Sequence, residues 1–241
     1  QWGTIWLQNG STNNTIQNLT LKNATVGLLI DGNNGTTVSL KNTQIYNCTH
    51  YGIQGKNAII EGENIVINYT GQASLACTYG GNYKFTHSTF NNNWSSPEQS
   101  AVYISNYSAG TTPETKNLTE ATFNNCIIYG SYSNEMILDK KSEALFNYQF
   151  NNCLLKFNNT SNKYTTDPLY QFDTDPTHYN AIILNKDPKF FNPNINNFNI
   201  DDTSSAFAKG NPAYLIPLDI LGITRTLPPD LGAYQNKLFP K

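Results

Sequence analysis

The segment QFDTDPTHYN brings together three side chains that can move a proton: Asp173, Asp175 and His178. On a strand, residues two positions apart share one face, so the two aspartates would project side by side. Carboxylates paired in this way can bind a hard cation such as Ca²⁺, or divide the acid and base roles of glycoside hydrolysis. The competing interpretation, which we favour, is an Asp-Pro turn in which the aspartates accept hydrogen bonds from backbone amides.

The segment NYKFTH supplies the basic candidates, Lys84 and His87. A polysaccharide lyase needs a Lys, Arg or His side chain to remove the proton beside the uronate carboxylate. Alternation along a strand would point Lys84 away from Tyr83 and Phe85 and towards solvent. The sequence shows none of the known signatures of β-helix lyases or glycosidases. We therefore assign no catalytic residue, metal or cofactor, and would expect Ca²⁺ only of a lyase.

Aromatic side chains give a stronger indication of function, because several fall in segments that lengthen along the chain. Loops on a rigid scaffold commonly carry binding residues, and flat rings with polar edges suit the faces of sugar rings. The expected carbohydrate-binding residues are Trp94, Tyr103, Tyr107, Tyr129 and Tyr132. The alternative is that individual rings pack against the scaffold.

A repeat in the sequence indicates the scaffold that positions these side chains. An apolar residue, any residue and then Asn recur at intervals of 21 to 33 residues, ending at Asn23, Asn47, Asn68, Asn92, Asn125 and Asn152. A second apolar position follows the first five at an offset that grows from 5 to 12: Leu28, Ile53, Leu75, Val102 and Ile137. Fixed spacings indicate tight turns, whereas the drifting one indicates a loop that tolerates insertion.

This pattern predicts an all-β fold, a right-handed parallel β-helix with three short strands per coil, over residues 1–185. Successive coils would stack about 4.8 Å apart, with inward apolar and outward polar side chains alternating along each strand. Asn tolerates the left-handed backbone of a sharp bend, and stacked Asn side chains can hydrogen-bond as a ladder. An antiparallel sandwich or barrel is the runner-up, but it would show turn signals about every 8–12 residues.

Cysteine follows the repeated Asn in three coils, at Cys48, Cys126 and Cys153. Stacking would place Cys126 and Cys153 in neighbouring coils. We expect a column of buried thiols that act as small apolar side chains. A disulfide between Cys126 and Cys153 is the alternative.

Residues 186–241 are too rich in proline to continue the coils, because proline cannot donate to a strand ladder. The end of a solenoid exposes strand edges and apolar core, which must be covered. We therefore predict a strap in the same domain that caps the last coil and runs back along the side. An ion pair between Arg225 and Asp230 would hold it.

Three motifs of this strap resemble a known family. They are a DP-x-F start at Asp187, Pro188 and Phe190, a middle with Ser205, Ala206 and Gly210, and the DLGAY end at Asp230, Leu231, Gly232, Ala233 and Tyr234. Together they resemble the C-terminal segment of the choice-of-anchor-Q group, among the secreted right-handed β-helix proteins of Bacteroidota. The resemblance implies an exported protein at the cell surface or outer membrane of a Gram-negative bacterium, and a chain that is the C-terminal portion of a longer protein. It implies no single activity, because most members have no known function and others stand among polysaccharide lyases and glycoside hydrolases.

Charge is scarce in this chain: 13% of the 241 residues are charged and the net charge is −2, against about a quarter charged in a typical soluble domain. Nothing in that balance favours nucleic acid or an anionic membrane as a partner. No apolar run approaches the roughly 20 residues of a membrane span. The oligomeric state stays open.

Three functional hypotheses follow. The first is an exported or surface protein that binds a polysaccharide or other glycan without assigned catalysis. The alternative is a polysaccharide lyase or glycoside hydrolase, which needs acidic or basic groups that converge in one cleft. A structural or adhesin-like surface protein is the second alternative, and it predicts aromatic rings packed flat with no groove.

Overall fold

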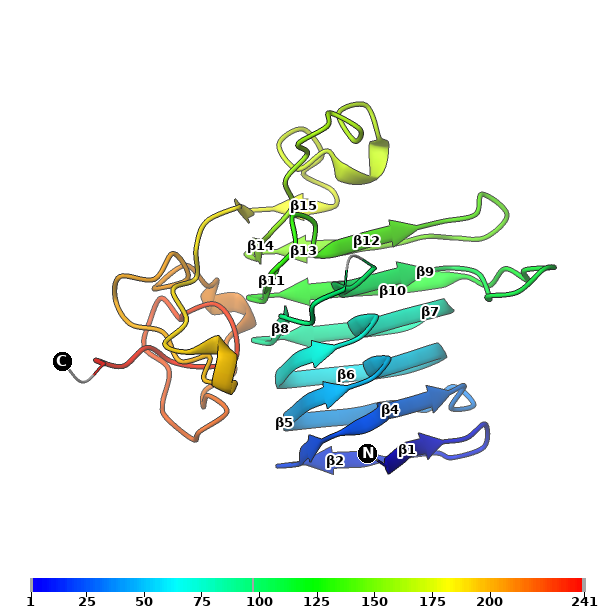
Figure 1. The fold of residues 1–241 in the computed structure, drawn as a ribbon, viewed down its shortest axis with the longest axis horizontal. Helices are drawn as coiled ribbons and strands as arrows, with labels where there is room; N and C mark the ends of the chain where they lie inside the picture. The colour runs from blue at the N-terminus through cyan, green and yellow to red at the C-terminus, as the bar shows by residue number, and fades with distance from the viewer. Residues whose placement is uncertain (1, 97, 240–241) are drawn as a thin grey trace.

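The chain forms a parallel β-solenoid of about six turns in the computed structural model, which describes residues 2–96 and 98–239. Each pairing between its named strands is parallel. The turns stack from the N-terminus upwards, and the C-terminal residues lie beside the stack (Figure 1). The all-β parallel β-helix predicted from the sequence is thus confirmed.

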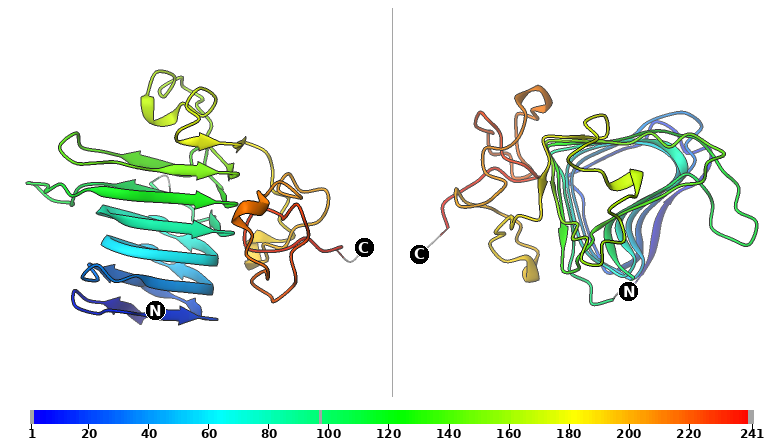
Figure 2. Two further views of the ribbon diagram at one scale, coloured as in Figure 1. Left: turned by 180° about the vertical axis from the view of Figure 1, so that it is seen from behind. Right: turned by 90° about the horizontal axis from the view of Figure 1, so that it is seen from above.

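Each turn is roughly triangular in cross-section, with strands on three faces (Figure 2). The groove face consists of β1 (Trp2–Leu7), β4 (Ala24–Asp31), β9 (Ser100–Ser105), β12 (Met136–Asp139) and the first parts of β6 (Tyr51–Thr70) and β7 (Ala73–Thr86). The tail face consists of β3 (Thr20–Lys22), β8 (Thr89–Asn92), β11 (Ile127–Gly130), β14 (Leu154–Leu155), β16 (Ile183–Leu184) and the last parts of β5 (Val38–Cys48) and β6. The third face consists of β2 (Thr15–Gln17), β10 (Leu118–Asn124), β13 (Gln149–Asn151), β15 (Tyr179–Asn180), the start of β5, the middle of β6 and the end of β7.

Asparagine forms the corner between the third face and the tail face. The corner residues have a left-handed φ between 48° and 54°, and they are Asn18, Asn42, Asn64, His87, Asn125 and Asn152. The Asn42 amide donates to Asn18 at 3.2 Å, and the Asn64 amide donates to Asn42 at 3.1 Å. The structure therefore contains an asparagine ladder, in which His87 replaces Asn in one turn.

The repeat predicted from the sequence combined Asn residues that lie at two different corners of the triangular turn. Asn23 and Asn47 also have a left-handed φ, but they lie between the tail face and the groove face. Phe123 accordingly pairs in register with Phe85 and Phe150, whereas Phe90 pairs with Ile67 and Ile128. Both corners follow an inward apolar residue and need a left-handed bend, so they carry the same local pattern.

The second apolar position of the repeat was predicted correctly in four of its five turns. Leu28, Ile53, Leu75 and Val102 pair in consecutive turns on the groove face. In the fifth turn Met136 pairs with Val102 and is buried, whereas Ile137 points outwards and is 36% exposed.

Aromatic rings fill the core of the last turns. Phe85 and Phe123 stack with ring centroids 5.6 Å apart, and Phe123 and Phe150 stack at 4.8 Å. Gly62 occupies the same inward position one turn earlier, where a Cβ atom would lie only 2.5 Å from the Phe85 ring. The core can therefore change from aliphatic to aromatic side chains at Phe85 because the paired residue in the preceding turn, Gly62, has no side chain.

All four cysteines are free and buried. Cys126 and Cys153 lie in neighbouring turns, and each thiol donates to a backbone carbonyl, that of Asn124 at 3.3 Å and that of Phe123 at 3.4 Å. Cys48 pairs in register with Thr70 and stands in a different column. The buried thiols are confirmed, but the single column predicted for them is wrong, because Cys48 follows the other corner.

We expect the native thiols to resist modification and four thiols to react after unfolding. Burial raises the pKa of Cys48 to about 11 and raises the pKa values of Cys77 and Cys153 well above their usual range, so little nucleophilic thiolate forms. Titration with an aromatic disulfide reagent, before and after adding denaturant and without reductant, measures this. Only two thiols after unfolding would reveal a disulfide instead.

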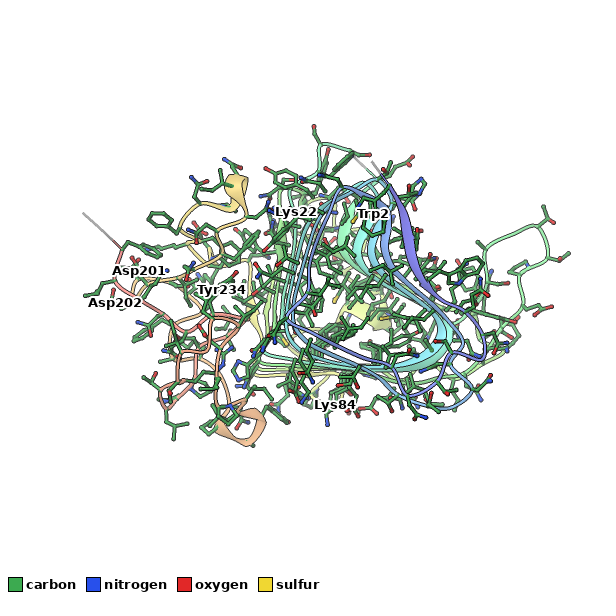
Figure 3. The ribbon with its side chains drawn as sticks, turned by 90° about the horizontal axis from the view of Figure 1, so that it is seen from below. Trp2, Lys22, Lys84, Asp201, Asp202 and Tyr234 are labelled. Atoms are coloured by element: carbon green, nitrogen blue, oxygen red, sulfur yellow. The ribbon has the colours of Figure 1, made fainter. Side chains whose placement is uncertain are left out.

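The tail packs along the side of the solenoid. Phe198, Ala233 and Tyr234 cover Tyr46 and Val66 of the tail face, and Figure 3 places Tyr234 between the tail and the solenoid wall. A second cluster of tail residues, Ile200, Ala206 and Leu231, covers Ile127 and Leu154. The tail contains two short 3₁₀ helices, η2 (Pro193–Ile195) and η3 (Pro212–Tyr214).

The cover over the final turn, predicted to come from the tail, comes from residues 157–178. This segment includes η1 (Pro168–Tyr170) and lies at the top of the stack in Figure 1. Phe157 stacks on Tyr170 with centroids 4.5 Å apart, and Tyr164 and Phe172 contact both rings. These aromatic rings pack on the apolar core, which leaves the tail free to run along the side.

The predicted ion pair between Arg225 and Asp230 is wrong. Arg225 is buried and donates to the Asn64 side chain at 2.9 Å and to the Gly232 carbonyl at 3.1 Å. Asp230 accepts from the backbone amides of Ala208 and Asn236. Arg225 therefore ties the tail to the asparagine ladder, and Asp230 shapes the tail itself, acting on the arginine only through its charge.

Candidate functional site

A groove of about 600 Å³ opens on the outer side of the groove face. Its floor comes from β6, β7, β9 and β12, and Glu98 contributes from the segment before β9. Ser108 and Ala109 contribute from the other side, in a long loop after β9 that closes through a bridge between Tyr107 and Thr115. One such loop projects well beyond the triangular stack in Figure 2. The parallel strands thus supply a flat floor, and inserted loops supply the walls.

The parallel register places the floor residues in columns that run along the solenoid axis. Gln54, Ala76, Tyr103 and Ile137 form the middle column, each paired with the next in the neighbouring strand. Ala76 is fully buried within this column, and the other three line the groove. Tyr51, Ala73 and Ser100 form a second column beside it. Because strands in successive turns lie about 4.8 Å apart, outward side chains in one column are immediate neighbours.

Two tyrosines meet one carboxylate at the end of this floor. Tyr103 Oη donates to Asp139 Oδ2 at 3.2 Å, and Tyr107 Oη donates to the same oxygen at 2.5 Å. Burial and the Asp139 charge raise the pKa of Tyr103, and the hydrogen bond to Asp139 raises the pKa of Tyr107. Both hydroxyls therefore stay protonated near neutral pH, and the shared acceptor holds the two rings in place.

A second aromatic element flanks the groove. Tyr79 Oη donates to Glu114 at 2.5 Å, and Lys116 Nζ lies 5.0 Å from the Tyr79 ring centre. Lys141 Nζ lies 5.3 Å from the Tyr107 ring centre in the same way. Acidic and basic side chains thus lie close to one another around the groove, so their charges compensate and the rim has no strong net charge of either sign.

The five aromatic residues predicted to bind carbohydrate lie in three places. Tyr103 and Tyr107 line the groove. Tyr129 lies on the tail face. Its ring centroid lies 6.4 Å from that of Phe190, edge to face, and 4.8 Å from Lys156 Nζ. Trp94 and Tyr132 are half-buried in loops beyond the groove lining. The structure thus brings Tyr103 and Tyr107 together and places the other three apart from them.

Asp173, Asp175 and His178 lie in turns of the final cover, so the predicted strand face is wrong. Asp175 accepts from the backbone amides of Thr177 and His178, and His178 Nδ1 lies 2.5 Å from Asp175 Oδ2. The His178 ring stacks on Tyr148 at 4.1 Å. Asp175 therefore closes an Asp-Pro turn, as the competing interpretation held, because Pro176 prevents a strand from continuing.

Lys84 and His87 do not share a cleft. Lys84 points outwards from the third face, as Figure 3 shows, beside Glu61 and Glu63 in a hollow of about 220 Å³ under η3. His87 is fully buried at the asparagine corner, and its Nε2 lies 3.1 Å from the Asn125 amide. Burial and the nearby Arg225 charge lower the pKa of His87 to about 3. A ring without access to solvent cannot take a proton from a bound polysaccharide.

Sequence reasoning missed Glu135, which is fully buried immediately before strand β12. Its Oε1 accepts from the Tyr132 backbone amide at 2.8 Å and from Gln99 Nε2 at 3.3 Å, while Oε2 and the Gln99 side-chain oxygen are buried without a partner among the described residues. Burial raises the pKa of Glu135 to about 7. Nothing in the local sequence distinguishes this glutamate, since its burial comes from the packing of neighbouring turns.

Comparison of the chain with protein-family models, with curated proteins and with solved structures found no match. The choice-of-anchor-Q resemblance therefore rests on the tail motifs themselves. Among the described residues, no helix has the length and apolar character needed to cross a membrane. Within that same part of the chain, no three His, Cys, Asp or Glu side chains gather as a metal site would require.

Proposed function

We propose that this protein binds a polysaccharide in the groove without cleaving it. The observation that carries the proposal is the pair Tyr103 and Tyr107, held by Asp139 on a groove of about 600 Å³. Sites for small ligands commonly have volumes of about 300–1,000 Å³ and combine apolar walls with a few polar groups. Sugar rings match such a lining, because they have apolar C–H faces and polar edges.

The remaining lining suits sugar hydroxyls. Gln54, Gln72 and Ser100 present amide and hydroxyl groups, and Glu98 adds a carboxylate acceptor. Amide and hydroxyl groups both donate and accept hydrogen bonds. A glycan could therefore replace the water that these groups bind, while its C–H faces contact the tyrosine rings.

Binding is favoured over cleavage because the candidate catalytic groups are dispersed. Asp173, Asp175 and His178 lie in the final cover, and Lys84 lies on the third face. Glu135 has the raised pKa that a general acid needs, but it is fully buried and does not line the groove. A structural role with flat, packed rings is disfavoured by the groove itself.

The proposal includes a place of action. The resemblance of the tail motifs supports export to the cell surface or outer membrane of a Gram-negative bacterium, and Asp230 and Tyr234 of these motifs are buried. A surface location would bring the groove to extracellular polysaccharide. Fractionation of cells that express the full-length gene product, followed by protease treatment of intact cells, tests this part separately.

We expect Tyr103→Ala and Tyr107→Ala each to weaken polysaccharide binding about tenfold, because aromatic contacts contribute about 0.5–1.5 kcal/mol beyond area burial. Affinity electrophoresis in gels that contain neutral or acidic polysaccharides, with and without Ca²⁺, measures the wild-type protein and both variants. Lys84→Ala, an exposed change on another face, is the control and should bind as wild type does.

Two results would overturn the proposal. The first is an absence of wild-type binding to every polysaccharide tested. The second is release of reducing ends from one of them, which would make the protein an enzyme. Thermal unfolding of each variant separates loss of the groove from loss of the fold.

A further inference from the structure

The groove is one part of a longer strip that runs along the solenoid axis. The middle floor column continues beyond Gln54 to Leu29 in β4 and then to Trp6 in β1, through successive parallel pairings. The whole column is Trp6, Leu29, Gln54, Ala76, Tyr103 and Ile137. Ala76 is fully buried, so the larger side chains on either side of it supply the exposed surface of the column. It crosses six strands of one face, one residue from each.

Trp6 points outwards, and about half of its surface is exposed among the described residues. Its neighbours Ile5 and Leu7 pack against the core, so alternation directs the Trp6 side chain to the opposite side of the strand. The residue is 51% exposed, although tryptophan is usually largely buried. A large flat ring therefore stands on β1 in the same column as Tyr103 and the partly exposed Ile137.

The column is uncharged throughout. Beside it, Asp31 pairs in register with Lys56 in the neighbouring strand, so charges in the adjacent column compensate each other. A polyuronate would place a row of carboxylates along this strip with no row of cations to meet them. The lining thus fits neutral sugars better than acidic ones.

The spacing of the column also selects a ligand shape. Five steps of about 4.8 Å give a strip about 24 Å long, and each step is close to the length of one pyranose unit in an extended chain. A linear glycan lying parallel to the axis would place successive rings over successive strands. A branched or coiled glycan could occupy the groove but would not follow the column to Trp6.

We propose that Trp6 is a distal binding platform and that the ligand is a neutral, linear polysaccharide that spans about five sugar units from Tyr103 to Trp6. This inference rests on the proposed function of the groove and adds the charge, shape and direction of the ligand. In this arrangement the groove holds one end of the bound segment, and the indole ring of Trp6 stacks on a sugar at the other end.

The test uses oligosaccharides of defined length as probes: neutral β-1,4-linked glucose, xylose and mannose oligomers of two to six units, and galacturonate oligomers as the acidic series. Calorimetric titration measures the affinity of the full chain for each. For the wild-type protein, affinity should rise with length up to at least five units for one neutral series. Trp6→Ala should lower affinity for the longest oligomers about tenfold and leave the shortest ones unchanged.

Trp2→Ala is the matched control. Trp2 lies in the same strand and is 44% exposed, but it falls outside the column and its indole N–H donates to the Lys22 carbonyl at 2.8 Å. This variant should bind all oligomers as wild type does. Loss of binding in both tryptophan variants would indicate damage to the first turn rather than loss of a platform, and would count against the inference.

The outcomes separate the inference from the proposal beneath it. If Tyr103→Ala weakens binding and Trp6→Ala does not at any length, the groove binds glycan and the platform is wrong. If the acidic series binds more tightly than every neutral one, the ligand class is wrong. If the wild-type protein binds no oligomer and no polysaccharide, both the inference and the proposed function fail.

Discussion

Phe123→Ala is expected to lower the free energy of unfolding by about 3–5 kcal/mol. The Phe123 ring is fully buried and is stacked between Phe85 and Phe150, with Phe90 edge-on at 6.1 Å. Its removal would leave a gap between two rings whose positions are set by adjacent strands. Those strands cannot move closer to each other without breaking the hydrogen bonds between their backbones. The cavity therefore persists, and its full energetic cost lowers the free energy of unfolding.

Urea unfolding followed by circular dichroism measures this effect. Phe191→Ala is the matched control, because Phe191 lies in the tail and is 45% exposed; its loss should cost less than about 1 kcal/mol. A loss below about 1 kcal/mol for Phe123→Ala as well would show that the ring stack does not support the fold. The register of the last turns would then need revision.

The repeating architecture could be predicted because its causes are local. An inward apolar residue, an outward residue and an Asn that tolerates a left-handed bend occupy three consecutive positions, and they recur whenever the chain turns. The assignment of Phe123 to its column failed for the same reason. Two corners of the triangle require the same local sequence, an inward apolar residue followed by an Asn that tolerates a left-handed bend. Only the pairing of Phe123 with Phe85 and Phe150 shows which corner follows Phe123.

The candidate site was predictable only in part. Tyr103 and Tyr107 stood out because they lie in segments that lengthen, and both line the groove. The contact with Asp139 and the column that reaches Trp6 depend on which residues of distant turns face one another. The sequence separates these residues by whole turns, and no local pattern links them.

The sequence also places the proton-transfer candidates only where a local signal exists. The spacing of Asp173 and Asp175 allows a shared strand face, but the Asp-Pro turn that the sequence favours is the one observed, because Pro176 prevents a strand from continuing. The side-chain oxygens of Asp175 bond to amides within its own turn. Burial by neighbouring turns raises the pKa of the Glu135 carboxyl group to about 7, and no local pattern announces that burial.

Glu135→Gln is expected to make the protein more stable than the wild type at pH 8, by up to about 3 kcal/mol, and to leave stability near wild type at pH 4. The pKa of Glu135 rises from 4.5 to about 7 on folding. Between these values the unfolded chain releases the proton and the folded chain keeps it. Stability from this group is therefore complete below about pH 4.5 and is lost as the pH rises towards 7.

The contacts of Glu135 explain why an amide should fit. Its Oε1 accepts from Tyr132 and Gln99, and the side-chain oxygen of the substituted glutamine would keep that role. The new amide nitrogen would stand where Oε2 now has no partner among the described residues. The side-chain oxygen of Gln99 likewise has no partner among the described residues.

His87 has the opposite pH dependence and must be separated from Glu135. Burial lowers its pKa to about 3, so the unfolded chain binds a proton between pH 3 and 6.5 that the folded chain does not. Stability from His87 is present above about pH 6.5 and is lost as the pH falls. The two slopes oppose each other in the wild-type protein between about pH 4.5 and 6.5, so the wild-type profile alone cannot identify either group.

Urea midpoints measured from pH 4 to 8 for the wild type, Glu135→Gln and His87→Asn resolve the two contributions. The difference between the wild type and Glu135→Gln should grow with pH and level off above 7. His87→Asn restores asparagine to the ladder beside Asn125, and its advantage over the wild type should grow instead as the pH falls below 6.5. A pH-independent difference for Glu135→Gln would mean that folding leaves the pKa of Glu135 unchanged, and that Lys156 and the backbone amides near its carboxylate offset the cost of burial.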